Sequence, residues 1–254
     1  MSNRGRKSAA RIAVAVGVLL LVCAFLFRGH AASALGGEPA LTVYVLRSGS
    51  AEQDGAVEAA LQEAGYSVTM GVPTPVWDGT SADLTAFDVV VLLNSYNWIS
   101  TEMPSAGQRA LMSYVAGGGG LITAEWLMWN VYRSGAASGL APALPATTSS
   151  YVAAVEPITY TRAAADPVLD EGVADSFTFA PNDVFGSEST LKPKQGATVF
   201  YQSGGASGAG VLGWDYREGR VLSFSTFISQ AELAHPDYRR LFRNGVRWAA
   251  GDSF

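Results

Sequence analysis

The first residues that invite a chemical interpretation are Glu125 and Trp126, which follow the stretch GGGGLITA at residues 117–124. A glycine turn leading into a short apolar run predicts a strand that ends in a tight turn. Many α/β enzymes hold a nucleophile at such a turn, but here the turn offers a carboxylate. Glu125 is a candidate general base whose pKa neighbouring indoles would raise. The alternative is a carboxylate that accepts hydrogen bonds from the first amides of a following helix.

Two further residues are candidates for catalysis beside Glu125. Glycoside hydrolysis usually needs two opposed carboxylates, and Asp215 is the only partner that we can name for Glu125. His235 is the only histidine beyond residue 34; a triad would pair it with a serine, yet no G-x-S-x-G motif is present. One histidine with scattered acids shows no metal-ligand spacing, so we expect no metal site and no cofactor.

A set of polar and aromatic residues follows the predicted strands. Open parallel sheets bind ligands at the carboxyl ends of their strands, near the topological switch point. Aromatic rings cover the apolar faces of sugars while amides and carboxylates bond hydroxyl groups, so this set favours a carbohydrate or another polar metabolite. Alternatively, the tryptophans belong to the core and the polar residues cap strand ends. The candidate ligand-binding residues are Ser48, Ser50, Asn94, Tyr96, Trp98, Glu125 and Trp126.

The elements that must position these residues alternate between strands and helices in the first half of the chain. Uninterrupted apolar strands joined by helices predict a parallel sheet covered on both faces. We expect the second helix to turn Gln108, Arg109 and Ser113 outward. The predicted strands are 41–47, 66–72, 84–95 and 120–125, and the predicted helices are 51–64 and 104–116.

The second half of the chain has a different pattern. Residues 134–150 are rich in Gly, Ala, Pro, Ser and Thr and predict a loop or lid. An amphipathic helix over 235–251 closes the chain, and its predicted inward residues are Tyr238, Leu241, Phe242, Val246 and Ala249. Short strands are predicted at 151–161, 176–180, 197–203, 209–216 and 219–227, with a hairpin loop at 204–210. Since no linker follows residue 40, residues 41–254 are expected to form one domain.

The first 34 residues have the pattern of a targeting segment. Four basic residues between Arg4 and Arg11 precede an apolar run over 12–27, and the AASA stretch at 31–34 offers a cleavage site after Ala34. The segment is either a cleaved signal peptide or a retained N-terminal membrane anchor, followed by a linker at 35–40. Both alternatives place the body outside the bacterial cytoplasmic membrane, as an anchored, secreted or periplasmic protein.

Charge and cysteine content exclude several classes of function. Five of the 17 basic residues lie before residue 35, so residues 35–254 carry 12 basic and 22 acidic side chains, a net charge of −10. Such an acidic body does not favour nucleic acid as a partner. The only cysteine is Cys23, within the apolar run. The body therefore has no disulfide, no thiol nucleophile and no sulfur ligand for zinc.

Five stretches in order resemble the class I glutamine amidotransferase-like superfamily, in particular its ThuA-like (trehalose-utilisation) branch and related bacterial envelope proteins. They are FDVVVLLN (87–94), LMSYVAGGGGLITAE (111–125), ADPVLDEGV (165–173), GWDYREGRVLSFSTF (213–227) and YRRLFRNGVRWAAG (238–251). The resemblance implies a flavodoxin-like α/β three-layer sandwich with a mostly parallel sheet.

The resemblance also bears on activity. Catalytic amidotransferases of this fold place a Cys after the fourth strand, so thiol-dependent glutamine hydrolysis is excluded here. ThuA-like members often carry a His near the end of the glycine-led strand, at or next to the position that Glu125 occupies here. We therefore expect an exported, non-catalytic domain that binds a polar ligand, such as a carbohydrate, or an envelope protein. The alternatives are a hydrolase or sugar-modifying enzyme using Glu125 with Asp215 or His235, and a structural subunit of a membrane complex.

Overall fold

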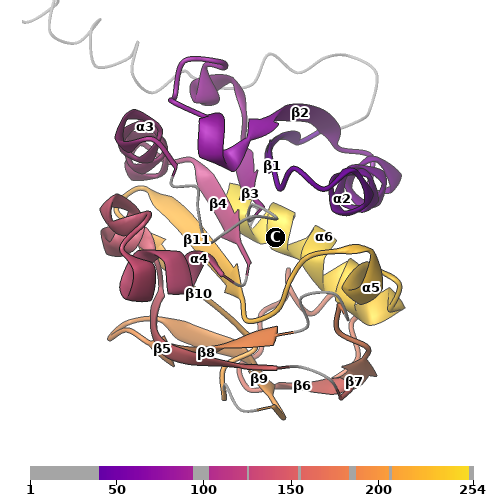
Figure 1. The fold of residues 1–254 in the computed structure, drawn as a ribbon. Helices are drawn as coiled ribbons and strands as arrows, with labels where there is room; N and C mark the ends of the chain where they lie inside the picture. The colour runs from indigo at the N-terminus through magenta and orange to yellow at the C-terminus, as the bar shows by residue number, and fades with distance from the viewer. Residues whose placement is uncertain are drawn as a thin grey trace, which may run out of the picture. The chain divides into compact units, whose positions relative to one another are not determined.

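A nine-stranded sheet, in the order β2-β1-β3-β4-β11-β10-β9-β6-β7, runs through the protein (Figure 1). The computed structural model describes residues 40–93, 103–124, 126–153, 156–182, 187–205 and 208–251. The chain from Ala40 onward forms a single unit.

The first five strands of this order are parallel. They are β2 (Ser67–Pro73), β1 (Thr42–Arg47), β3 (Val89–Leu92), β4 (Gly120–Thr123) and β11 (Gly219–Phe224). Strands β1, β3, β4 and β11 are largely apolar and buried, as parallel strands covered on both faces must be. The order 2-1-3-4, completed by β11, is that of a flavodoxin-like sheet, with its switch point between β1 and β3.

Helices cover both faces of the parallel strands (Figure 1). One buried cluster joins the sheet to α2 (Ala51–Glu63) and α6 (Pro236–Ala250), and a second joins it to α3 (Ser105–Ala116). The predicted three-layer α/β arrangement is therefore present. The five residues predicted to face inward from the last helix are all buried; they are Tyr238, Leu241, Phe242, Val246 and Ala249.

The remaining four strands of the sheet are antiparallel. They are β10 (Val211–Tyr216), β9 (Thr198–Ser203), β6 (Ile158–Arg162) and β7 (Ser176–Phe179). A separate two-stranded ribbon pairs β5 (Ala146–Ala153) with β8 (Ser187–Pro193). The shorter elements are α4 (Leu127–Trp129), α5 (Gln230–Leu233), the π-helical turn η3 (Asn130–Ser134) and the 3-10 turns η1 (Thr74–Val76), η2 (Leu84–Ala86) and η4 (Ser138–Ala143).

Several sequence-based boundaries were wrong. The strand predicted from residue 84 begins only at Val89, because the Asp83 side chain accepts a hydrogen bond from the Thr85 amide and caps the 3-10 turn η2. The predicted loop at 134–150 contains η4 and the start of β5, and the strand predicted at 151–161 divides between β5 and β6. The prediction of an outward Gln108 fails as well, because its side chain is buried.

The predictions for the N-terminal segment fall on residues outside the described ranges. These are the anchor or signal at 1–34, with its apolar run at 12–27 and Cys23, and the linker up to residue 39. Within the ranges that the structure describes, no helix has the length and apolar character needed to cross a membrane. Membrane attachment and export therefore stay predictions.

Candidate functional site

The parallel strands β1, β3, β4 and β11 all end at the same side of the sheet, which we call the carboxyl edge. The described residues that follow these ends are 48–50, 93, 124, 126 and 225–229. In open α/β sheets ligands bind at this side. Four predicted site residues, Asn94, Tyr96, Trp98 and Glu125, lie outside the described residues, so their roles stay predictions.

Hydrogen bonds to the first turn of α2 hold the loop after β1 in place. Ser48 is buried, and both its amide and its hydroxyl donate to Oδ1 of Asp54, at 2.7 and 2.8 Å. Ser50 is the N-cap of α2, and its hydroxyl accepts from the Gln53 amide at 3.4 Å. The two hydroxyls predicted to bind ligand thus already stabilise the loop and the start of the helix.

Trp126 has an unusual backbone at the turn after β4. Its φ of 70° and ψ of −28° place a bulky residue in the left-handed region, which costs an L-residue about 1–2 kcal/mol. The indole is 5% exposed and meets the ring of Trp129 edge to face, with centroids 6.2 Å apart. Backbone strain of this kind concentrates at functional sites. The π-helical turn η3, which begins at Asn130, is a second irregularity typical of such sites.

A chain of buried hydroxyl groups lies beyond the end of β11. The Ser225 hydroxyl donates to Oε1 of Glu188 at 2.6 Å and lies 2.9 Å from the hydroxyl of Tyr160. Tyr160 also contacts Thr226, whose hydroxyl lies 3.0 Å from that of Tyr238. Burial, followed by the charge of Glu188, raises the pKa of Tyr160 well above its usual range, so this phenol remains protonated.

Glu232 is a second buried acid near this edge. Its carboxylate accepts from the Ser229 hydroxyl and from the Asn182 amide, the latter at 2.7 Å. Burial raises the pKa of Glu232, although these hydrogen bonds oppose the shift. Sequence reasoning missed both Glu188 and Glu232. The run SFSTFIS at 223–229, which mixes hydroxyl residues with apolar ones, was the available signal for buried polar groups beyond this strand.

Asp215 does not lie at the carboxyl edge. It pairs in register with Arg220, which in turn is level with Gly120, the first residue of β4. Its side chain is 76% exposed and forms a 3.2 Å ion pair with Arg220. Because β10 runs opposite to β11, the structure places Asp215 at the amino end of the parallel strands, away from the carboxyl edge.

His235 has a local role at the start of α6. It is the N-cap residue, and its Nδ1 accepts from the Asp237 amide at 3.2 Å. Its ring stacks on Phe177, with centroids 5.3 Å apart and planes inclined by 19°. These contacts account for the histidine through helix capping and packing. In the described part of the chain, no three His, Cys, Asp or Glu residues are grouped so that they could hold a metal ion.

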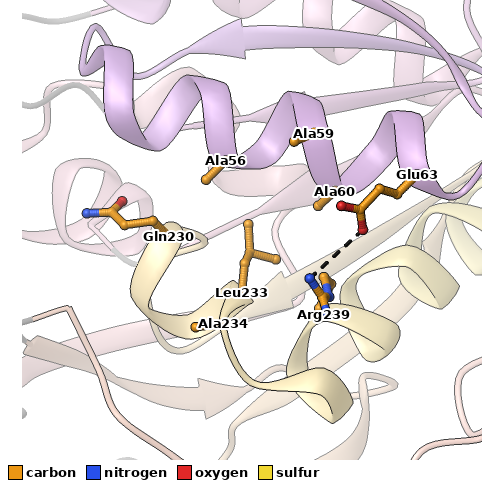
Figure 2. A pocket seen from close by; sticks show the side chains of 8 residues that line it. All are labelled: Ala56, Ala59, Ala60, Glu63, Gln230, Leu233, Ala234 and Arg239. Atoms are coloured by element: carbon orange, nitrogen blue, oxygen red, sulfur yellow. Dashed lines mark ion pairs between the residues drawn. The ribbon is translucent and has the colours of Figure 1, made fainter.

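A groove of about 240 Å³ lies between α2 and α5 (Figure 2). Alanines of α2 and Leu233 supply most of its wall. Its two charged residues, Glu63 and Arg239, lie 3.9 Å apart, and Glu63 also pairs with Arg243. The groove is therefore lined mainly by small apolar side chains, and its one acid, Glu63, is already in ion pairs. None of the predicted site residues lines it.

Comparison with solved structures places this arrangement in a known fold class. A cytoplasmic protein from Salmonella typhimurium superposes with a TM-score of 0.62 at 15% identity over 82% of this chain and 98% of its own. A thua-like protein from Bacteroides uniformis gives 0.64 at 11% identity, over 87% and 95%. A glutamine amidotransferase from Thermotoga maritima gives 0.58 at 12% identity, over 85% and 100%.

These likenesses confirm the predicted fold. The protein has the class I glutamine amidotransferase-like fold, and its structural neighbours include ThuA-like proteins. No family model matches the sequence, and no curated protein matches it.

Proposed function

We propose that this protein is a non-catalytic amidotransferase-like domain that binds a neutral polar ligand, such as a carbohydrate, at the carboxyl edge. The observation that carries the proposal is the left-handed backbone of Trp126. A strained aromatic residue at the end of a central strand, where sheets of this order bind ligands, supports a binding role for the indole.

The positions of the other candidate residues support a binding role over a catalytic one. The sole cysteine is at position 23, before the domain. Asp215 lies at the opposite end of the strands, and His235 is engaged as a helix cap. Trp126 and Trp129, which meet edge to face, supply aromatic rings that suit the apolar face of a sugar.

The experiment is a thermal-shift screen of residues 40–254 against neutral sugars, polyols and glutamine. A ligand at about 100 times its Kd adds roughly 2.7 kcal/mol, which for a domain of this size raises Tm by about 5–11 °C. Trp126→Phe tests the site, and Trp77→Phe is the matched control because Trp77 is fully buried in the core.

The outcomes separate binding from catalysis. We expect a sugar to stabilise the native protein and the Trp77 variant, and to stabilise the Trp126 variant less. An equal response of the two variants would remove Trp126 from the site. Glu125→Gln is run in parallel with a turnover assay on each stabilising ligand. If the native protein turns over a ligand and Glu125→Gln does not, the protein is an enzyme and the binding role is wrong. If no compound shifts Tm, an envelope protein remains as the alternative partner.

We further propose that the domain lies on the outer side of the bacterial cytoplasmic membrane. The basic residues and the apolar run at 12–27 support this location. Protease treatment of intact spheroplasts expressing the full chain should degrade the domain while a cytoplasmic marker survives. Survival of the domain in spheroplasts and digestion only after lysis would overturn the proposed location, and N-terminal sequencing of the mature protein distinguishes a cleaved signal from an anchor.

A further inference from the structure

A second hollow, which we call the α3 pocket, lies between α3 and η4. Its volume is about 540 Å³, within the usual range for small-molecule sites. It shares no residue with the carboxyl-edge set described above. The residues that line it are Ser105, Gln108, Arg109, Met112, Ser113, Ser138 and Gly139.

Gln108 fixes the two walls of the α3 pocket to each other. Its Nε2 donates to the Met103 carbonyl at 2.7 Å, and its Oε1 accepts from the Gly139 amide at 2.9 Å. A Cβ at position 139 would lie 2.6 Å from that Oε1, so any larger residue there would require the Gln108 side chain to shift. The α3 pocket is therefore a preformed feature of the fold, which lowers the ordering cost of binding a ligand.

Four polar side chains that line the α3 pocket have no hydrogen-bond or ion-pair partner among the described residues: Ser105, Arg109, Ser113 and Ser138. Three of them recur every four residues along α3 and so share one helix face. By contrast, the four arginines of α6 are engaged: Arg239 and Arg243 with Glu63, Arg247 with Glu171, and Arg240 with the Gly172 carbonyl.

The charge of the α3 pocket is opposite in sign to the net charge of the domain. Arg109 is its only charged lining residue, whereas residues 35–254 carry a net charge of −10. Arg109 has no acidic partner among the described residues, and its guanidinium presents a planar set of donors that matches the oxygens of a carboxylate or a phosphate. The neighbouring serine hydroxyls can both donate to and accept from a polyol.

We propose that the α3 pocket binds a small hydroxylated molecule that carries an oxyanion group. The oxyanion pairs with the Arg109 guanidinium, the hydroxyl groups bond Ser105, Ser113 and Ser138, and Met112 covers the carbon skeleton. This site is separate from the neutral-ligand site proposed at the carboxyl edge, and each can fail without the other.

Calorimetric titration of residues 40–254 tests this site with three probes. Gluconate carries a carboxylate, glycerol 3-phosphate carries a phosphate, and glycerol is the uncharged control. We compare the native protein with Arg109→Gln and with Arg217→Gln, which removes an exposed arginine from the β10–β11 turn. Arg109 is also exposed, so neither substitution opens the core.

We expect saturable binding of at least one charged probe, a Kd about tenfold or more higher for Arg109→Gln, and an unchanged Kd for Arg217→Gln. The probe that binds distinguishes a carboxylate ligand from a phosphate ligand. The proposal is overturned if neither charged probe saturates the native protein, if glycerol binds as well as they do, or if both arginine variants weaken binding equally. Trp126→Phe should leave this titration unchanged, which keeps its outcome distinct from that of the carboxyl-edge experiment.

Discussion

The left-handed backbone of Trp126 predicts an inverted order of stability between two substitutions. Trp126→Ala and Trp126→Gly both remove the indole, and they differ only in whether a Cβ remains. Within a helix, a Gly variant is less stable than the corresponding Ala variant. At a φ of 70° glycine should be the more stable.

The expected difference follows from opposing backbone terms. Loss of a buried tryptophan costs about 3–5 kcal/mol in either variant, and this cost cancels in the comparison. The left-handed conformation destabilises the Ala variant by about 1–2 kcal/mol. The Gly variant avoids this cost, but its unfolded chain has more backbone freedom, which offsets about half of that advantage. The Gly variant should therefore be more stable by about 1 kcal/mol, or about 2–4 °C in Tm.

Leu127 provides the matched control because it is the next residue, is buried and is α-helical. There the Ala variant should be more stable than the Gly variant by about 1 kcal/mol. Denaturant unfolding of the four variants, followed by circular dichroism, measures both differences. If Trp126→Ala is more stable than Trp126→Gly, as at Leu127, the backbone strain on which the proposed site depends is absent.

Three further predictions concern two glycines and a buried acid. Gly55→Ala should stabilise the domain by about 0.5–1 kcal/mol, since Gly55 lies within α2 with open space around it, whereas Gly219→Ala should lower Tm by several degrees because its Cβ would collide with the backbone oxygens of Val115 and Gly119. A lowered Tm for Gly55→Ala would contradict the first, and an unchanged Tm for Gly219→Ala the second. Because burial raises the pKa of Glu232 in the folded state, that state holds its proton to higher pH than the unfolded chain. Stability should thus fall as pH rises from the unfolded value of 4.5 through the raised pKa, and Glu232→Gln should flatten this fall in urea unfolding measured across that range; equal slopes would contradict the assignment.

The elements that sequence reasoning predicted well are those whose burial dictates their composition. The strand at Val89–Leu92 is wholly apolar because helices cover both its faces, and the last helix shows a clear inward stripe. Strand β8 was missed because SESTLKP carries none of that signal. Its buried acid Glu188 accepts a hydrogen bond from Ser225, which lies 37 residues away in the sequence.

The candidate site was harder to predict because the local sequence of a strand does not show whether it runs parallel or antiparallel to its neighbours. Ser48 follows an apolar strand and Asp215 lies in the last turn-side residues of another, so the local sequence gives both the same pattern. However, β10 is antiparallel to its neighbour, which carries Asp215 to the other end of the sheet. The helical pattern predicted that Gln108 faces outward. Its side chain is instead covered by the segment around Gly139, whose amide donates a hydrogen bond to Oε1 of Gln108.

The pairing of β4 with β11 has a consequence for the order in which the protein is made. Gly120 and Arg220 are level in the sheet although one hundred residues separate them in the chain. At 5–20 residues per second, β4 waits roughly 5–20 s on the ribosome for its neighbour, with one row of backbone groups unpaired. Synthesis itself thus provides a window in which a chaperone or an export factor can capture the unfinished chain.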